Sequence, residues 1–597
     1  MRRSRILRPF GALRRLTVTW GNHGIFWSVA LLCAISRFAA RARSLWDWDE
    51  ALFCLGMIEY DVTSHHPHPP GFPVYIAMAK LARFVTNDDF RAFQSLNLIA
   101  GMLVFPAVFL LARQIGLRFE TSIVAGVLFA FFPNVWFFGG TAFSDLPSIV
   151  IAVFAAVFLF RGTESRRDYF IGTFLLALAI GIRPQNLLVG LFPGILATLR
   201  RPLRDVLAAL VLGIVVVGVA FGGAVYATGS LDAFLTTVRG HSEYIAQVDS
   251  FRSPNRPPLW RIFDRFFLKQ YQSAALSIIT SLFVIVSVAG AIRNRDRSML
   301  YNFLTFAPFA LAAWLMLDRY SISRFSIGYA PMFAIFAADG IRRVVERGRP
   351  RPRAEAVLAT LLIAAFAIWT FPALAPVRNE VSPTVRAVEA AKRAIDPAAD
   401  TLFVGYSMGP FVEYLAPNLP FIRVIGVSAV PLTPAKQPFL LAEVGRGAPE
   451  GEVFRRERGR LWNIARRHYF EVMLTPLTNT ARFGEGWYEP RRRGADEWRW
   501  MGARSSTLLQ PSSDRRELRI EFTVPSAVAG GTLTVTLNDK VIARVPLDGS
   551  NAALSWDVDP APNGIPNRLD LAVDRTAEEE GRMVGLKMRY LGWGATR

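Results

Sequence analysis

The stretch FRAFQSLNLIAGMLVFPAVFLLARQIG (90–116) decides the fold, because its central part is an apolar run of membrane length that ends in basic residues. A run of about 18 or more apolar residues is typical of a helix that crosses a lipid bilayer, where the backbone must satisfy its own hydrogen bonds. The chain of 597 residues is 52% hydrophobic, and similar runs recur up to about residue 374. The sequence therefore predicts a polytopic α-helical membrane protein.

Eleven runs are predicted to span the membrane, and short basic loops separate many of them. Lys and Arg concentrate in the cytoplasmic loops of membrane proteins. This rule places the basic N-terminus in the cytoplasm and the part after residue 374 on the extracytoplasmic side. The predicted spans are roughly 24–42, 94–113, 119–138, 143–161, 169–183, 184–199, 204–227, 272–292, 299–317, 325–341 and 354–374. The basic loops are 112–118, 161–168, 200–205, 293–297 and 342–353.

Two features near this pattern need separate interpretation. The run FPVYIAMAKLARFVT (72–86) is short, and as a span it would place every later basic loop outside. It is therefore predicted to lie along the outer interface or to dip only partly into the membrane. The runs 169–183 and 184–199 are also short, and the Arg183-Pro184 junction between them predicts a broken helix at the outer side.

The formal net charge of +21 follows from the basic loops. Because the basic residues form short clusters between apolar runs, they do not predict a nucleic-acid partner. The two cysteines, Cys33 and Cys54, do not form the pattern of a disulfide framework. The first apolar run has no small-residue cleavage site after it, which predicts an uncleaved first span.

The composition changes after residue 374. Residues 375–504 alternate between helix-like and strand-like patterns and predict an extracytoplasmic α/β domain. Residues 505–597 show period-two alternation, with LNDK (537–540) as a hairpin turn, and predict a C-terminal β-sandwich. The predicted domains are thus 1–374, 375–504 and 505–597.

Polar residues gather just beyond the first span, in SLWDWDEALFCLGMIEYDVTSHHPHPPGFPVY (44–75). Asp49 and Glu50 could simply cap a short helix, since carboxylates stabilise a helix N-terminus. A carboxylate in this place could also accept a proton from a substrate. The Pro-Pro pair at 69–70 ends any helix from before, and His68 precedes the next one.

Charged residues from three later outer segments fall on the same side of the membrane. Asp145 lies in GGTAFSDLP, Arg183 at the helix break, and Arg319 and Arg324 in LDRYSISRFSIGYAP. Each arginine alone could be an interfacial anchor. Together with the acids they match the needs of a lipid-phosphate substrate, which are arginines for phosphate oxygens and a carboxylate for a proton.

An outer Asp-Glu pair, a His-Pro-Pro that opens the next helix and an Asp in the second outer loop resemble the GT-C glycosyltransferase superfamily. The similarity is to the protein O-mannosyltransferase and aminoarabinose-transferase type, with an HPPG(Y/F)P signature. The resemblance covers most of residues 40–340. It is carried by WDWDEALF, HPHPPGFPVYIAMAKL, FFPNVWFFGGTAFSDLPSIV, ALAIGIRPQNLLVGLFPGI and RYSISRFSIGYAPMFAIFAA.

The resemblance implies roles for individual residues. Asp49 matches the catalytic base, and Glu50 matches a neighbour that supports the site. His68 takes the His/Lys place before Pro-Pro. Asp145 matches a second-loop acid that binds a metal or orients the acceptor, and Arg183 matches a basic residue that binds the donor.

Two further arginines are implied in substrate binding. Arg324 stands where such proteins often have Arg-Tyr, but Phe325 follows it here, so a hydroxyl role at that place is in doubt. Arg319 is a weaker candidate.

The reaction implied is the inverting transfer of a sugar from a polyprenyl-phosphate donor to an acceptor hydroxyl on a glycan, lipid or protein. It would take place on the outer side of a membrane, expected to be the bacterial inner membrane, with membrane lipids as further partners. No P-loop or Rossmann fingerprint is present, as expected for an enzyme that uses no soluble nucleotide donor.

Three alternatives stay open. A divalent metal ion could use Asp49, His66, His68 and Asp145, although their spacing matches no known zinc pattern. The protein could be a transporter or flippase for a lipid-linked sugar, which would need the arginines but no base. It could also be a non-catalytic envelope scaffold, which would leave the clustered acids unexplained.

Overall fold

The computed structural model contains two compact units. The first, the helical unit, holds residues 20–43 and 56–380, and the second, the strand-rich unit, holds residues 44–55 and the described residues after 380. The structure describes residues 20–593 except 249, 255, 269–270, 316–321, 347–348, 350, 399, 425–436, 445–450, 457–470, 477–480, 494–495, 510–515, 562–564 and 580.

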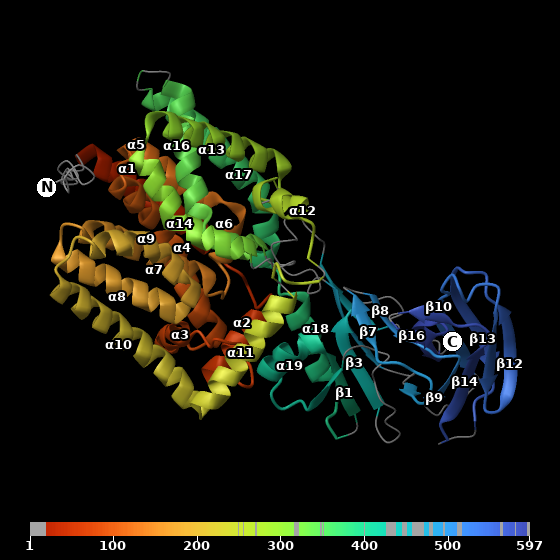
Figure 1. Ribbon diagram of the computed structural model, residues 1–597. Coiled ribbons are helices and arrows are strands. Elements are labelled where there is room, and N and C mark those ends of the chain that lie inside the picture. Colours follow the sequence, from red (N-terminus) through yellow and green to blue (C-terminus); the bar gives the residue numbers. More distant parts are fainter. Residues whose placement is uncertain are drawn as a thin grey trace. The chain divides into compact units, whose positions relative to one another are not determined.

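Helices make up almost all of the regular structure in the helical unit (Figure 1). They are α1 (Trp20–Ala39), α3 (Pro73–Thr86), α4 (Asp89–Gln114), α5 (Phe119–Phe131), α6 (Pro133–Phe138), α7 (Asp145–Gly162), α8 (Arg166–Ile182), α9 (Leu187–Thr198), α10 (Leu203–Thr228), α11 (Leu231–Val248), α12 (Leu259–Phe263), α13 (Ala274–Asn294), α14 (Arg297–Leu315), α15 (Ile322–Phe325), α16 (Ala330–Glu346) and α17 (Pro352–Asn379). Short 3-10 turns η1 (Pro184–Asn186) and η3 (Ser326–Gly328) and a π-helical turn η2 (Asp264–Leu268) connect some of them. The helix α2 (Trp48–Ile58) begins in the strand-rich unit and ends in the helical unit.

Among the described residues, six helical segments are long and apolar enough to cross a membrane. They are α4, α7, α10, α13, α14 and the segment that begins with α17. This confirms the predicted polytopic helical membrane part, while the count of eleven spans stays a prediction. The other predicted spans correspond to α1, to α5 with α6, and to α8, α9 and α16.

Prolines mark two places where a helix ends and the next helical turn begins. The segment predicted as one span over 119–138 consists of two helices, because α5 ends at Phe131 and α6 begins at Pro133. Phe132 between them has φ −59° and ψ 135°, outside the helical region, as the residue before a proline prefers. The break predicted at Arg183-Pro184 is confirmed, since Arg183 is extended at φ −145° and ψ 113°.

Helices α13 and α16 pack closely because α16 has a glycine at the contact. A Cβ atom added to Gly340 would overlap the backbone carbonyl oxygen of Phe283 in α13. Small residues at such positions let two membrane helices approach each other. Gly218 in α10 is different, because a Cβ atom there would meet no described atom within 4 Å.

The Gly340→Ala variant is therefore expected to be less stable than the wild type by about 1–3 kcal/mol, since the extra methyl group forces the two backbones apart. Gly218→Ala is the matched control and is expected to be neutral or slightly stabilising, because alanine favours the helix. Thermal unfolding of both variants in the same detergent checks this. Equal midpoints for the two variants would contradict the close contact.

The strand-rich unit begins with an α/β part. Its elements are α18 (Pro383–Ala394), β1 (Asp400–Gly405), a 3-10 turn η4 (Tyr406–Met408), α19 (Gly409–Leu415), β2 (Phe421–Val424), β3 (Gln437–Glu443), β4 (Glu452–Arg455) and β5 (Glu471–Pro476). The five strands form one sheet in the order β2-β1-β3-β5-β4. Strand β1 runs parallel to both β2 and β3, whereas β5 is antiparallel to β3 and β4.

Two five-stranded antiparallel sheets follow. One has the order β13-β10-β17-β8-β7 and the other β12-β11-β14-β9-β6. The strands are β6 (Ala481–Phe483), β7 (Arg491–Arg493), β8 (Asp496–Trp500), β9 (Arg504–Leu509), β10 (Arg516–Thr523), β11 (Thr532–Leu537), β12 (Lys540–Pro546), β13 (Asn551–Val558), β14 (Asn567–Val573) and β17 (Lys587–Trp593), with a small hairpin of β15 (Ala577–Glu579) and β16 (Arg582–Val584).

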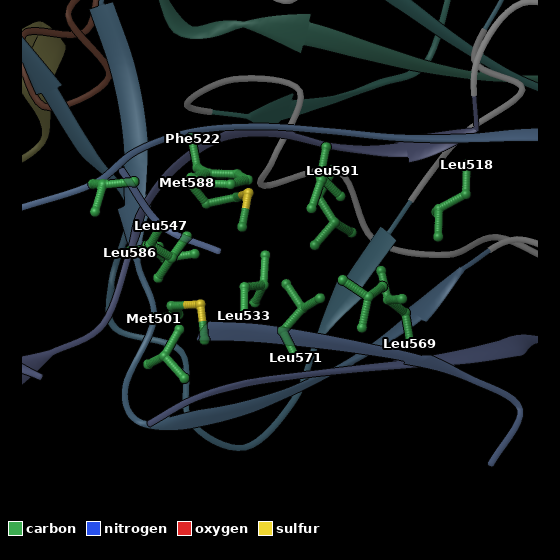
Figure 2. Close-up of a cluster of buried hydrophobic side chains, with 14 of the residues drawn as sticks. Met501, Leu518, Phe522, Leu533, Leu547, Leu569, Leu571, Leu586, Met588 and Leu591 are labelled. Atoms are coloured by element: carbon green, nitrogen blue, oxygen red, sulfur yellow. The ribbon is translucent and has the colours of Figure 1, made fainter. Parts of the chain in front are cut away.

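Side chains from both sheets share one hydrophobic core, as expected for a sandwich. In Figure 2, Phe522 and Met588 from one sheet lie opposite Leu533 and Leu571 from the other. The burial of β11 alternates strictly along its length, which is the period-two pattern that predicted these strands. The hairpin predicted at LNDK is also confirmed, with Asn538 and Asp539 at positive φ between β11 and β12.

Candidate active site

Asp145 and Arg183 form a buried ion pair in the helical unit. Asp145 is the first residue of α7, and Arg183 lies at the break between α8 and η1. Arg183 Nη2 donates to Asp145 Oδ2 over 2.8 Å, and its Nε donates to Ser144 Oγ over 2.9 Å. Both charged side chains are only 7% exposed. Pro184 favours an extended backbone at Arg183, and at this helix break the guanidinium of Arg183 reaches the start of α7.

Arg324 joins the same carboxylate from another part of the chain. Its Nε lies 3.7 Å from Asp145 Oδ2, and its side chain is 8% exposed. The guanidinium carbon is also 5.0 Å from the centre of the Phe143 ring, which is a favourable cation–π distance. One carboxylate therefore lies between two guanidiniums, and these three side chains together carry a net charge of +1.

Phe72 connects this group to the His-Pro-Pro segment. Its ring centre is 5.3 Å from the guanidinium carbon of Arg183 and 4.7 Å from the ring centre of His68. Phe72 is 4% exposed and has φ 48°, a left-handed conformation that bulky residues rarely adopt. Strained backbone of this kind is concentrated at functional sites. Arg183 and His68 thus flank one buried ring.

A further histidine comes close from α11, in the segment 229–271. The ring centre of His241 lies 6.1 Å from that of His68 and 6.0 Å from that of His65. Tyr244, one turn further along α11, has its ring centre 6.4 Å from that of His241. The predicted spans 204–227 and 272–292 leave this segment between them, and their spacing does not give its proximity to His68.

Asp49 and Glu50 belong to the strand-rich unit, at the start of α2. Glu50 is fully buried, and its Oε2 accepts hydrogen bonds from the backbone N–H of Trp46 over 2.6 Å and of Asp47 over 3.0 Å. Asp47 Oδ1 accepts from the N–H of Asp49 over 3.0 Å. These carboxylates hold the turn that carries Asp49, whose side chain is 5% exposed.

Sequence reasoning missed that residues 44–55 pack with the chain after residue 380. Ser44 Oγ accepts a hydrogen bond from the backbone N–H of Ser382 over 2.9 Å. The ring centres of Trp48 and Tyr406 are 5.5 Å apart. The two tryptophans in the polar stretch SLWDWDE were the one available signal, because large aromatic side chains tend to find a packing partner.

The structure does not place two of the predicted features, Arg319 and a metal site, in this group. Arg319 lies outside the described residues. For the metal candidates, the described residues contain no group of three His, Cys, Asp or Glu side chains arranged to hold an ion.

Comparison with known proteins supports the resemblance seen in the sequence. The family described as dolichyl-phosphate-mannose-protein mannosyltransferase matches residues 65–222. This part holds His68, Asp145 and Arg183, and it confirms the similarity to GT-C membrane glycosyltransferases. No curated protein sequence matches the chain.

Solved structures show distant likeness. ArnT from Cupriavidus metallidurans, bound to undecaprenyl phosphate, is 12% identical with a TM-score of 0.47, over 76% of this chain and 98% of that one. AglB from Archaeoglobus fulgidus, in complex with an inhibitory peptide and a dolichol-phosphate, is 12% identical with a TM-score of 0.46, over 71% and 70%. The arabinofuranosyltransferase AftD from Mycobacteria is 11% identical with a TM-score of 0.44, over 95% and 61%. At these values the likeness assigns no role to any residue.

Proposed function

We propose that this protein is a glycosyltransferase that moves a sugar from a polyprenyl-phosphate donor to an acceptor hydroxyl, with inversion at the anomeric carbon. The observation that carries the proposal is the buried group of Asp145, Arg183 and Arg324 within an apolar helical unit. Guanidiniums suit the oxygens of a phosphate, and an apolar helical unit suits the lipid chain that carries it. The match of residues 65–222 to a mannosyltransferase family supports the same function.

Asp49 is the proposed base. Its carboxylate accepts the proton of the acceptor hydroxyl as that oxygen attacks C1 of the donor sugar. The bond between C1 and the phosphate oxygen breaks, and the polyprenyl phosphate leaves with the electron pair. Glu50 positions Asp49 by holding the backbone of the turn before it.

Arg183 and Arg324 are proposed to stabilise the charge that develops on the leaving phosphate. A guanidinium has five N–H donors, and two of those of Arg183 bind Asp145 and Ser144. Asp145 fixes the orientation of Arg183 by a hydrogen bond and attracts the charge of Arg324. His68, whose ring also contacts that of Phe72, is proposed to contact the donor, and Arg319 remains a further candidate for that role.

The proposed setting is the bacterial inner membrane, with the N-terminus in the cytoplasm and the reaction on the outer side. This orientation rests on the basic loops. Residues 375–504 and 505–597 are proposed to be extracytoplasmic domains that contact a glycan, lipid or protein acceptor. The predicted partners include membrane lipids and no nucleic acid.

Mass spectrometry of envelope glycans and glycoproteins, from cells with and without the protein, tests this function. We expect one class of sugar modification to disappear without the protein and its lipid-linked donor to accumulate, because the transfer step is missing. Complementation with the Asp49→Asn variant separates the alternatives. A transporter or a scaffold needs no base, so full restoration of the modification by this variant would favour one of them.

A further inference from the structure

A second cluster of arginines lies in the helical unit, apart from the group around Asp145. It surrounds a pocket of about 280 Å³ at the C-terminal ends of α1 and α17 and near the N-terminal end of α4. The lining residues are Arg41, Ala42, Arg43, Arg91, Arg378 and Asn379. Four of these six side chains are guanidiniums and none is an acid, so the lining has a formal charge of +4.

Backbone carbonyls hold two of the four guanidiniums in place. Arg43 Nη1 donates to the carbonyl of Asn379 over 2.9 Å. Arg91 donates through Nη1 to the carbonyl of Ala42 over 3.2 Å and through Nη2 to that of Arg43 over 3.1 Å. These bonds join three segments that are far apart in the sequence. The tertiary fold therefore forms this pocket, because the hydrogen bonds that join its three segments also position two of its guanidiniums.

The charges of the cluster are not balanced by acids. Among the described residues, the structure records no ion pair between a carboxylate and Arg41, Arg43, Arg91 or Arg378. The guanidiniums of Arg41, Arg91 and Arg378 line the same pocket and repel one another. A bound anion would relieve this repulsion, because opposite charge nearby favours the protonated guanidinium.

The surface next to the pocket indicates what kind of anion fits. On α1, Ile35 and Phe38 are more than half exposed, and the guanidinium carbon of Arg41 lies 4.0 Å from the centre of the Phe38 ring. On α17, Phe371 is 62% exposed and precedes Arg378 by seven residues, which is two helical turns on the same face. In a membrane protein such exposed apolar side chains face acyl chains. Apolar surface therefore leads to the arginines along both helices.

We propose that this pocket binds the phosphate headgroup of an anionic membrane lipid, whose acyl chains lie along the exposed faces of α1 and α17. Arginine clusters suit phosphate because each guanidinium can donate two parallel hydrogen bonds to its oxygens. A free phosphate ion has the same oxygens but no apolar part, so it would leave the exposed surface of Phe38 and Phe371 unused. The site does not depend on the proposed transfer reaction.

The test compares lipids and variants on the purified full-length protein. Native mass spectrometry measures retention of phosphatidylglycerol and of zwitterionic phosphatidylcholine, and thermal unfolding measures protection by each lipid. The variant is Arg41→Gln/Arg378→Gln, because Arg41 donates only to the nearby Phe38 carbonyl and Arg378 has no side-chain hydrogen bond recorded among the described residues. The matched control is Arg239→Gln/Arg252→Gln, which removes two exposed arginines elsewhere.

We expect the wild type and the control to retain phosphatidylglycerol in preference to phosphatidylcholine, and the double variant to bind it about tenfold more weakly, since charge-assisted hydrogen bonds are lost. Equal retention of the two lipids by the wild type, or equal binding by the double variant and the control, would overturn the proposal. Inorganic phosphate that protects lipid-free protein as well as phosphatidylglycerol does would assign the pocket to a soluble anion instead. Should the double variant not fold, Arg378→Gln alone serves in the same comparison.

Discussion

Replacing Asp49 with Asn is expected to lower the rate of sugar transfer by about 10²–10⁴-fold, the usual contribution of a general base. The amide has nearly the shape of the carboxylate but cannot take the acceptor proton. The hydrogen bond from the Asp49 N–H to Asp47 Oδ1 involves only the backbone of residue 49 and should remain. The measurement is the initial rate of sugar transfer by purified protein in lipid, together with binding of the donor, which should change little.

Asp61→Asn is the matched control for this experiment. Asp61 lies in the same polar stretch, 44–75, where its Oδ1 accepts from the N–H and hydroxyl of Thr63. An asparagine oxygen can still accept such bonds, so transfer is expected to stay near the wild-type rate. A variant at Asp49 that transfers as fast as this control would rule out Asp49 as the base.

The second large effect is expected at the ion pair of Asp145 and Arg183. Arg183→Gln removes one partner of a buried pair, which typically costs about 3–5 kcal/mol of stability because the other charge stays buried. Arg324, 3.7 Å from the same carboxylate, should keep the loss at the low end of this range. Transfer should fall by about 10²–10³-fold as well, the usual effect of removing one group that stabilises developing negative charge.

A double-mutant cycle separates these two effects. In Asp145→Asn/Arg183→Gln both charges are removed, so denaturant unfolding should show part of the stability regained, whereas transfer should stay as low as in Arg183→Gln. Lys392→Gln is the comparison at an exposed pair, since Lys392 binds Glu389 over 3.0 Å and the two side chains are 41% and 42% exposed. There the loss should be only about 0–1 kcal/mol. Recovery of transfer in the double variant would show that Arg183 has no role beyond its ion pair.

The sequence predicted the helical unit well because a membrane helix leaves a simple trace in composition. Long runs such as those of α4 and α10 need nothing from the rest of the chain to be recognised. The break within 119–138 was not predicted, because apolar residues continue on both sides of Phe132, although Pro133 disfavours a helical conformation at the residue before it. The same rule applied at Pro184 gave the correct break, so the information was present in both places.

Less of the candidate site could be predicted. The alternation of basic cytoplasmic loops with outer segments placed Asp145, Arg183 and Arg324 on one side of the membrane in the sequence prediction. The structure brings these three side chains together. The order of the loops cannot predict the contact of Phe72 with both His68 and Arg183, because that contact depends on the backbone conformation of one turn. It also cannot give the packing of residues 44–55 with residues after 380, which involves partners more than 330 positions apart.

This last packing limits how far the protein can be shortened. A chain cut after residue 380 would keep the ion pair of Asp145 and Arg183, but it would lose Ser382 and Tyr406, which hold Ser44 and Trp48. The turn that bears Asp49 would then lack its support. If Asp49 is the base, the helical unit alone is therefore expected not to transfer sugar, because the support of the Asp49 turn comes from residues after 380.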